Sequence, residues 1–93
     1  MTSTETISIG TKGFSDIIDI TPRVLSCVKN AGSTEGLTTI FCPGSTGALT
    51  TIEYEPGVLR DLREALEKIA PSDVEYHHNA RWGDGNGFSH VRA

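Results

Sequence analysis

Alternating and clustered apolar residues divide the first half of the chain into short segments that predict β-strands. Residues 4–9 (TETISI) alternate polar and apolar side chains, which is typical of a half-buried strand. Residues 14–20 (FSDIIDI), 36–42 (GLTTIFC) and 48–55 (ALTTIEYE) are rich in β-branched residues, with aromatic residues among them. The glycine-containing sequences GTKG and PGSTG predict turns between these extended segments.

Apolar residues spaced three and four positions apart predict a first amphipathic helix. It is expected to begin at Thr21, a capping residue that is followed by Pro22. Asn30 and Gly32 provide its end. Cys27 lies on the apolar stripe of this helix, so we expect a core thiol rather than a reactive one.

A second amphipathic helix is predicted over residues 56–70. Its buried stripe consists of Leu59, Leu62, Leu66 and Ile69. Beyond it, residues 74–78 predict a short strand, 79–87 a loop and 88–93 the start of another extended element. A strand at the end of a chain leaves an uncovered sheet edge, which predicts a partner chain or a continuation of the protein.

Length and charge limit the classes of function. The 93 residues are enough for a single domain, and a net charge of −4 argues against general binding of nucleic acids or anionic membranes. No apolar run is long enough to span a bilayer, and the N-terminus does not have the pattern of a signal peptide. Two cysteines make no disulfide framework. We therefore expect a cytoplasmic protein that, being small, gains from self-association.

All three histidines lie in the glycine-rich segment 76–90. His78, Asp84 and His90 follow the spacing H-x5-D-x5-H, and the glycines allow the two ends of the segment to converge. Imidazole and carboxylate groups bind zinc, manganese or iron, and three protein ligands leave an open position for substrate. The alternative is a polar loop whose histidines are acid–base groups or surface residues. Because neighbouring strand residues point to opposite faces, only one of His77 and His78 is expected to serve the site.

Three further groups are candidates for substrate binding or acid–base chemistry. The PGSTG turn could hold an anion on its backbone N–H groups, with hydroxyl donors from Ser45 and Thr46, although for the turn alone an ordinary tight hairpin is the favoured interpretation. Glu53 offers a carboxylate on the open face of a predicted strand. Two guanidinium groups that could bind phosphate flank the histidines, Arg81 and Arg92. For these three charged side chains, simple solvation is the alternative.

Two long stretches of the sequence resemble the YjbQ family, which is named for secondary thiamine-phosphate synthase activity. They are FCPGSTGALTTIEYEPGVLRDLREALEKIAP and YHHNARWGDGNGFSHVRA. The chain is similar to the branch in which a PGST turn replaces a histidine-threonine-serine turn. This resemblance implies an α+β fold in which two packed β-sheets and helices form a sandwich, usually assembled as a trimer.

The resemblance also implies a cleft in which histidines and acids gather, often with a divalent metal ion. The matching positions are Ser45, Thr46, Glu53, His78, Asp84 and His90. The implied reaction joins hydroxymethylpyrimidine diphosphate to a thiazole phosphate and releases pyrophosphate. A non-catalytic metal- or ligand-binding trimeric module and a metal-dependent phosphohydrolase are the alternatives. Relatives commonly carry histidine at the position of Phe88 and continue through further strands, so we expect residues 1–93 to be one C-terminally truncated domain.

Overall fold

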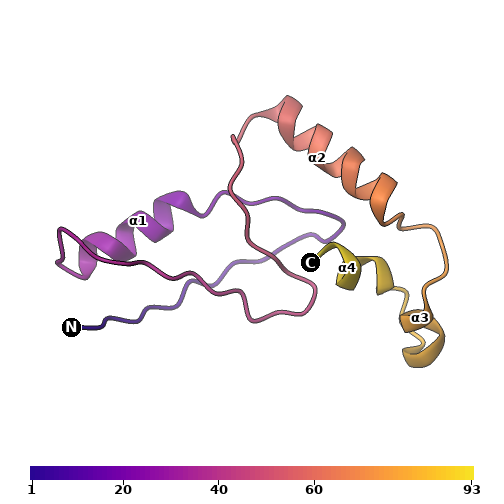
Figure 1. Cartoon of the computed structure of the whole chain (residues 1–93), viewed down its shortest axis with the longest axis horizontal. Coiled ribbons are helices and arrows are strands. Elements are labelled where there is room, and N and C mark those ends of the chain that lie inside the picture. Colours follow the sequence, from indigo (N-terminus) through magenta and orange to yellow (C-terminus); the bar gives the residue numbers. More distant parts are fainter. The chain divides into compact units, whose positions relative to one another are not determined.

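The computed structural model describes all residues from 1 to 93, and its regular secondary structure is entirely helical (Figure 1). Its four helices are α1 (Thr21–Asn30), α2 (Pro56–Ile69), α3 (His77–Trp82) and α4 (Gly87–Arg92). The chain divides into two compact units, Met1–Ile40 with α1 and Phe41–Ala93 with the other three helices. No helix has the length and apolar character needed to cross a membrane. That residues 1–93 are one domain stays a prediction.

The predicted α+β sandwich of two β-sheets is wrong, because the structure contains no strand. Four segments predicted as strands form none: residues 4–9, 14–20, 36–42 and 48–55. A strand exists only when its backbone shares ladder hydrogen bonds with a neighbouring segment. Alternation along the sequence indicates an extended backbone with two unlike faces, but it does not identify a pairing partner. The hydrophobic pattern therefore could not decide between a sheet and unpaired coil.

Helix α1 forms where it was expected, but its first turn is capped differently. The N-cap position is Ile20, which offers no side-chain oxygen, and Asp19 accepts the backbone N–H of Thr21 at 3.0 Å. Hydrogen bonds from Thr21 hold the pKa of Asp19 below its usual value. Cys27 is half-buried, and a hydrogen bond with Glu5 is the main cause of its raised thiol pKa.

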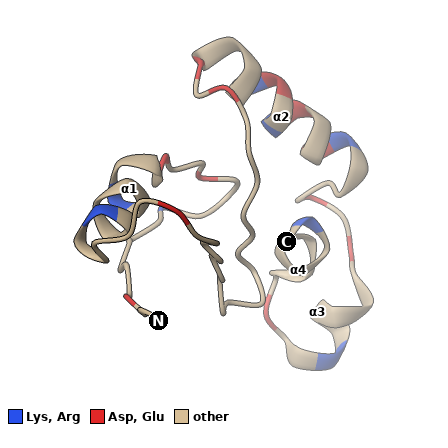
Figure 2. Ribbon diagram, turned by 60° about the vertical axis from the view of Figure 1, so that its left-hand side comes forward, with Lys and Arg blue, Asp and Glu red and all other residues tan.

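Helix α2 confirms the second predicted helix and carries charges of both signs along its length (Figure 2). Its N-cap is Glu55, whose two carboxylate oxygens accept the backbone N–H groups of Gly57 and Val58, each at 2.8 Å. Leu59 is buried as predicted, whereas Ile69 is 77% exposed. The apolar stripe of α2 is therefore covered at its start and open at its end.

Two helices lie within the last 20 residues, α3 and α4, where a strand, a loop and an extended segment were predicted. Helix α3 ends at Gly83, whose left-handed backbone (φ 74°) lets its N–H bond to the carbonyl of Asn79 at 2.8 Å. Ala80 and Arg81, within α3, are good helix formers. In α4, burial of Phe88 overrides the preference of β-branched Val91 for extended backbone.

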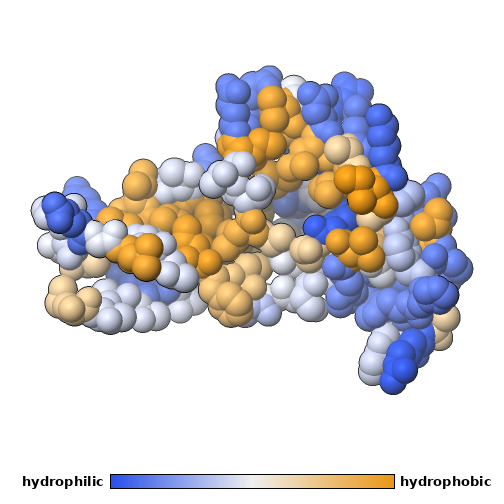
Figure 3. All heavy atoms as spheres, viewed as in Figure 1, coloured by the Kyte–Doolittle hydropathy of each residue, from blue (hydrophilic) through white to orange (hydrophobic).

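The buried apolar core is small and consists of Leu59, Ala70 and Phe88. Figure 3 shows apolar side chains at the surface as well, and exposed ones include Leu37 and Phe41. A core of this size supplies little hydrophobic stabilisation. Hydrogen bonds between side chains and backbone therefore have a large share in positioning α3 and α4.

Candidate functional site

The histidine segment forms two short helices that pack against each other. Helix α3 carries His78, helix α4 carries His90, and Asp84 lies in the connection between them. The connection is tight, because Asn86 donates its N–H to the carbonyl of Asp84 at 2.7 Å. Residues twelve positions apart in the sequence are thereby brought to one place, as the spacing of the motif predicted.

His78 is the centre of this cluster. Its Nε2 atom lies 3.3 Å from Oδ1 of Asp84, and its ring centroid lies 4.2 Å from that of His90. The contact with Asp84 lacks hydrogen-bond geometry, so Nε2 is buried without a hydrogen-bond partner. The side chain of His78 is 30% exposed, and that of Asp84 is 52% exposed. A carboxylate beside a half-buried imidazole can orient the ring.

The neighbouring His77 takes no part in the cluster. It is exposed, whereas His78 is half-buried against Asp84 and His90. The expectation that only one of the two histidines faces the site agrees with this placement, but the physical reason differs. Both residues belong to a helix, where consecutive side chains are rotated by about 100°.

The metal site stays a prediction. No group of three or more His, Cys, Asp or Glu side chains has an arrangement that could hold a metal ion. The chemistry of the donors nevertheless suits a divalent cation, because a buried imidazole nitrogen without a hydrogen-bond partner lies beside a carboxylate at His78 and Asp84.

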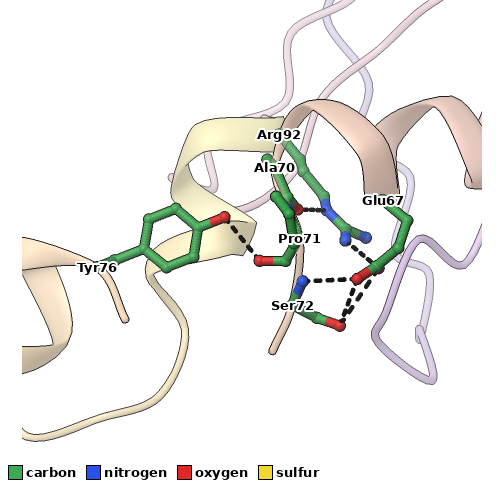
Figure 4. Close-up of polar contacts among 6 residues, drawn as sticks. All are labelled: Glu67, Ala70, Pro71, Ser72, Tyr76 and Arg92. Atoms are coloured by element: carbon green, nitrogen blue, oxygen red, sulfur yellow. Dashed lines mark hydrogen bonds and ion pairs between the residues drawn. The ribbon is translucent and has the colours of Figure 1, made fainter. Parts of the chain in front are cut away.

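The two arginines near the histidines have different surroundings. Arg92 donates from Nε to the carbonyl of Ala70 at 2.9 Å and from its terminal nitrogen to Glu67 at 2.6 Å (Figure 4). Its side chain is only 9% exposed, and its guanidinium lies 4.9 Å from the ring centre of Phe88. Arg81 is exposed beside the ring of Trp82. Of the two guanidinium groups, that of Arg81 is the more accessible to a phosphate.

The PGST turn and Glu53, which carries the predicted carboxylate, lie in exposed segments without regular secondary structure. Ser45 and Thr46 form a turn, as expected, and both are exposed, as is Glu53. Within the turn, a Cβ atom at Gly47 would lie 2.8 Å from Sγ of Cys42, so this position is packed against a side chain. The structure records no contact between these three candidates and the histidine cluster. It therefore brings together half of the six matched positions.

Similarity to known proteins covers nearly the whole chain. The family model described as "UPF0047 protein YjbQ-like" matches residues 5–93. The chain belongs to the YjbQ-like UPF0047 family. A UPF0047 protein of Methanothermobacter thermautotrophicus is 34% identical over 97% of this chain and 62% of its own length. One from Archaeoglobus fulgidus is 38% identical over 84% of this chain and 58% of its own length.

A third relative, the UPF0047 protein YugU of Bacillus subtilis, is 29% identical over 96% of this chain and 66% of its own length. The chain thus spans about three fifths of the length of the first two curated relatives. No solved structure matches the chain. Membership of the YjbQ-like family is therefore shown, whereas the activity of the whole protein is a matter for proposal.

Sequence reasoning missed two residues of this YjbQ-like chain that form hydrogen bonds with α4, the helix of His90. Asn79 accepts the N–H of Gly87 through Oδ1 at 2.8 Å, and Glu67 accepts from Arg92 and Ser72. Asn79 directly follows the candidate ligand His78, and this position was the only sequence feature that could have drawn attention to it. Glu67 and Arg92 are 25 positions apart, so no local sequence pattern could have predicted their contact.

Proposed function

We propose that this chain carries part of the active site of a secondary thiamine-phosphate synthase-like transferase. The reaction would join hydroxymethylpyrimidine diphosphate to a thiazole phosphate and release pyrophosphate. The observation that carries the proposal is the cluster of His78, Asp84 and His90 on α3, α4 and their connection. The choice of substrates follows the resemblance to the YjbQ family, which is named for this activity.

The reaction needs a group that stabilises the negative charge that develops on the diphosphate as it leaves. A bond forms between the thiazole nitrogen and the pyrimidine methylene carbon while the bond from that carbon to the diphosphate oxygen breaks. Negative charge grows on the leaving oxygen, and a protonated imidazole can stabilise it or transfer a proton to it. In this proposal His78 or His90 has that role, and Asp84, 3.3 Å from His78, orients the imidazole.

The remaining candidates would bind the phosphates. The exposed guanidinium of Arg81 would neutralise charge on the diphosphate. Ser45 and Thr46 would bind a phosphate through hydroxyl and backbone N–H groups, and Glu53 would act as an acid–base group. Arg92 could bind phosphate only by exchanging its contacts with Glu67 and Ala70.

A divalent metal ion fits the same proposal. His78 and Asp84 would contribute ligands to it, and His90 would join them only if the three side chains left their present arrangement, which does not form a metal site. When bound, the ion would supply Lewis-acid stabilisation of the diphosphate charge. Zinc, manganese and iron all accept such ligands. We also propose a cytoplasmic setting and a homotrimer, for which the support is the resemblance and the small core.

One observation favours a non-catalytic metal- or ligand-binding module as the second candidate. Phe88, at the position where the resemblance implies histidine in relatives, is only 6% exposed and belongs to the core. The chain therefore uses this position for packing, and an apolar side chain stands where the resemblance implies a proton carrier or ligand. In such a module the histidine cluster would bind without turnover.

The test combines metal content and product formation in one set of samples. The purified chain, its His90→Ala variant and the matched control His77→Ala are analysed for bound metal and for thiamine phosphate. We expect product from the chain and from His77→Ala, and a loss of at least about 100-fold in His90→Ala. Metal binding without product in all three samples would favour the module, and neither metal nor product in a folded chain would contradict both candidates.

A further inference from the structure

The start of α4 is held by a side chain from α3. The first N–H groups of a helix have no partner within the helix, and a residue at the N-cap often accepts one of them. Here the N-cap Asn86 makes no such bond. Instead, Oδ1 of Asn79, on α3, accepts the N–H of Gly87 at 2.8 Å in a half-buried position.

This bond lies where the start of α4 packs closely against α3 and its N-cap residue, Tyr76. Gly87 is buried, and a Cβ atom at this position would lie 2.5 Å from Cβ of Tyr76 and 2.7 Å from Oδ1 of Asn79. Such distances are too short for any side chain beyond hydrogen. The glycine therefore allows the amide of α4 to approach the carboxamide of Asn79.

The bond also joins the two helices that carry the imidazoles of the cluster. Asn79 directly follows His78 on α3, and Gly87 is followed three positions later by His90 on α4. Both helices have six residues, which is too short for independent stability. The connection contains Gly83 and Gly85, which permit many backbone conformations. A fixed distance between the rings therefore needs a contact between the helices themselves.

We infer that Asn79 is a positioning residue, which holds the His90 helix against the His78 helix through its bond to Gly87. The link to catalysis rests on the proposed function, whereas the positioning of the rings does not. Asn79 itself accepts a backbone N–H and is assigned no contact with substrate. Its removal should separate the imidazoles without removing any ionisable group from the cluster.

The experiment measures the proximity of the two rings directly by NMR on the full chain. A nuclear Overhauser effect between ring protons of His78 and His90 is recorded for the wild type, Asn79→Ala, Asn79→Asp and Tyr76→Phe. Asn79→Asp keeps an oxygen that can accept the Gly87 N–H. Tyr76→Phe is the matched control, because it removes a different half-buried hydrogen bond, from the Tyr76 hydroxyl to the carbonyl of Pro71 at 2.7 Å.

We expect the ring-to-ring signal in the wild type, Asn79→Asp and Tyr76→Phe, and its loss in Asn79→Ala. A signal of wild-type intensity in Asn79→Ala, or its absence from the wild type, would overturn the inference. If Asn79→Ala does not fold, Asn79→Asp decides, since a folded Asn79→Asp chain without the signal contradicts the role of the oxygen acceptor.

Product formation in the same samples separates this inference from the proposed function. Asn79→Ala is expected to lower kcat at least about tenfold with little change in KM, and Asn79→Asp to restore most of it. A wild-type chain that shows the ring signal but forms no product would contradict the proposed function and leave the positioning role supported.

Discussion

Residues 71–93 and residues 41–54 belong to the same unit, and both contain segments that the hydrophobic pattern assigned to strands. The first region folds into α3 and α4, which are joined by side-chain contacts and contribute Phe88 to the core. The second has no regular secondary structure, and Phe41 is 81% exposed. The difference shows that side-chain contacts within the chain, rather than β-propensity, decide which segments of this unit form regular secondary structure.

The largest effect is expected from adding a side-chain atom at the tight contact between α3 and α4. Gly87→Ala should destabilise the chain by about 1–3 kcal/mol or more, because the added Cβ atom would overlap Tyr76 and Asn79. Gly85→Ala is the matched control, since a Cβ atom added there would have no other atom within 4 Å. Urea unfolding followed by circular dichroism measures both. Equal stability of the two variants would mean that the helices do not pack closely.

Arg92→Ala should have the next largest effect. The substitution removes the hydrogen bond to Ala70 and the packing of the side chain on Phe88, at a cost of about 1–2 kcal/mol. Arg81→Ala, which removes an exposed contact with Trp82, should cost about 0.5 kcal/mol or less. Thermal unfolding compares the two variants. A larger loss in Arg81→Ala would contradict the anchoring role of Arg92.

A smaller effect, dependent on pH, is expected at Glu55, where the extended region ends. Hydrogen bonds from the backbone N–H groups of Val58 and Gly57 hold the pKa of Glu55 below its ordinary 4.5. A lowered folded-state pKa contributes stability above the unfolded pKa, which is lost as pH falls through the folded value. Unfolding midpoints between about pH 6 and pH 3 should therefore fall less steeply in Glu55→Gln than in the wild type.

The control for this comparison is Glu53→Gln, which changes an exposed carboxylate two positions earlier without touching the cap. Its midpoints should follow those of the wild type over the same range. A Glu55→Gln chain with an unchanged pH dependence would show that the cap contributes no stability linked to protonation.

The smallest effect is expected in the extended region itself. Phe41→Ser should change stability by no more than about 0.5 kcal/mol, because the ring is 81% exposed and belongs to no packed element. Urea unfolding provides the measurement. A loss above about 1 kcal/mol would show that this region is packed or paired in solution, and the contrast with residues 71–93 would not hold.

The sequence predicted the helices whose determinants are local. Proline at the start of α1 and α2, and an apolar stripe along each, were sufficient to place them within about one residue. Helices α3 and α4 were missed because their stability depends on Gly83 in a left-handed conformation and on contacts such as Asn79 with Gly87. Such contacts leave no periodic signal in the sequence.

The candidate site residues stay predictions, although the structure brings three of them close together. The spacing of His78, Asp84 and His90 pointed to a cluster, and the structure places the three side chains together. The phosphate-binding roles stay predictions. For Arg92 in particular, the sequence suggested an exposed guanidinium, whereas its partners Glu67 and Ala70 lie far away in the chain and were not foreseeable.

The central claim is that His78 and Asp84 act as one unit in a transferase site, and a double-mutant cycle tests it most directly. Thiamine-phosphate formation is measured for the wild type, His78→Gln, Asp84→Asn and the double variant. We expect strong non-additivity, with the double variant losing little more than His78→Gln alone. Additive losses, or a folded wild-type chain that forms no product, would contradict it.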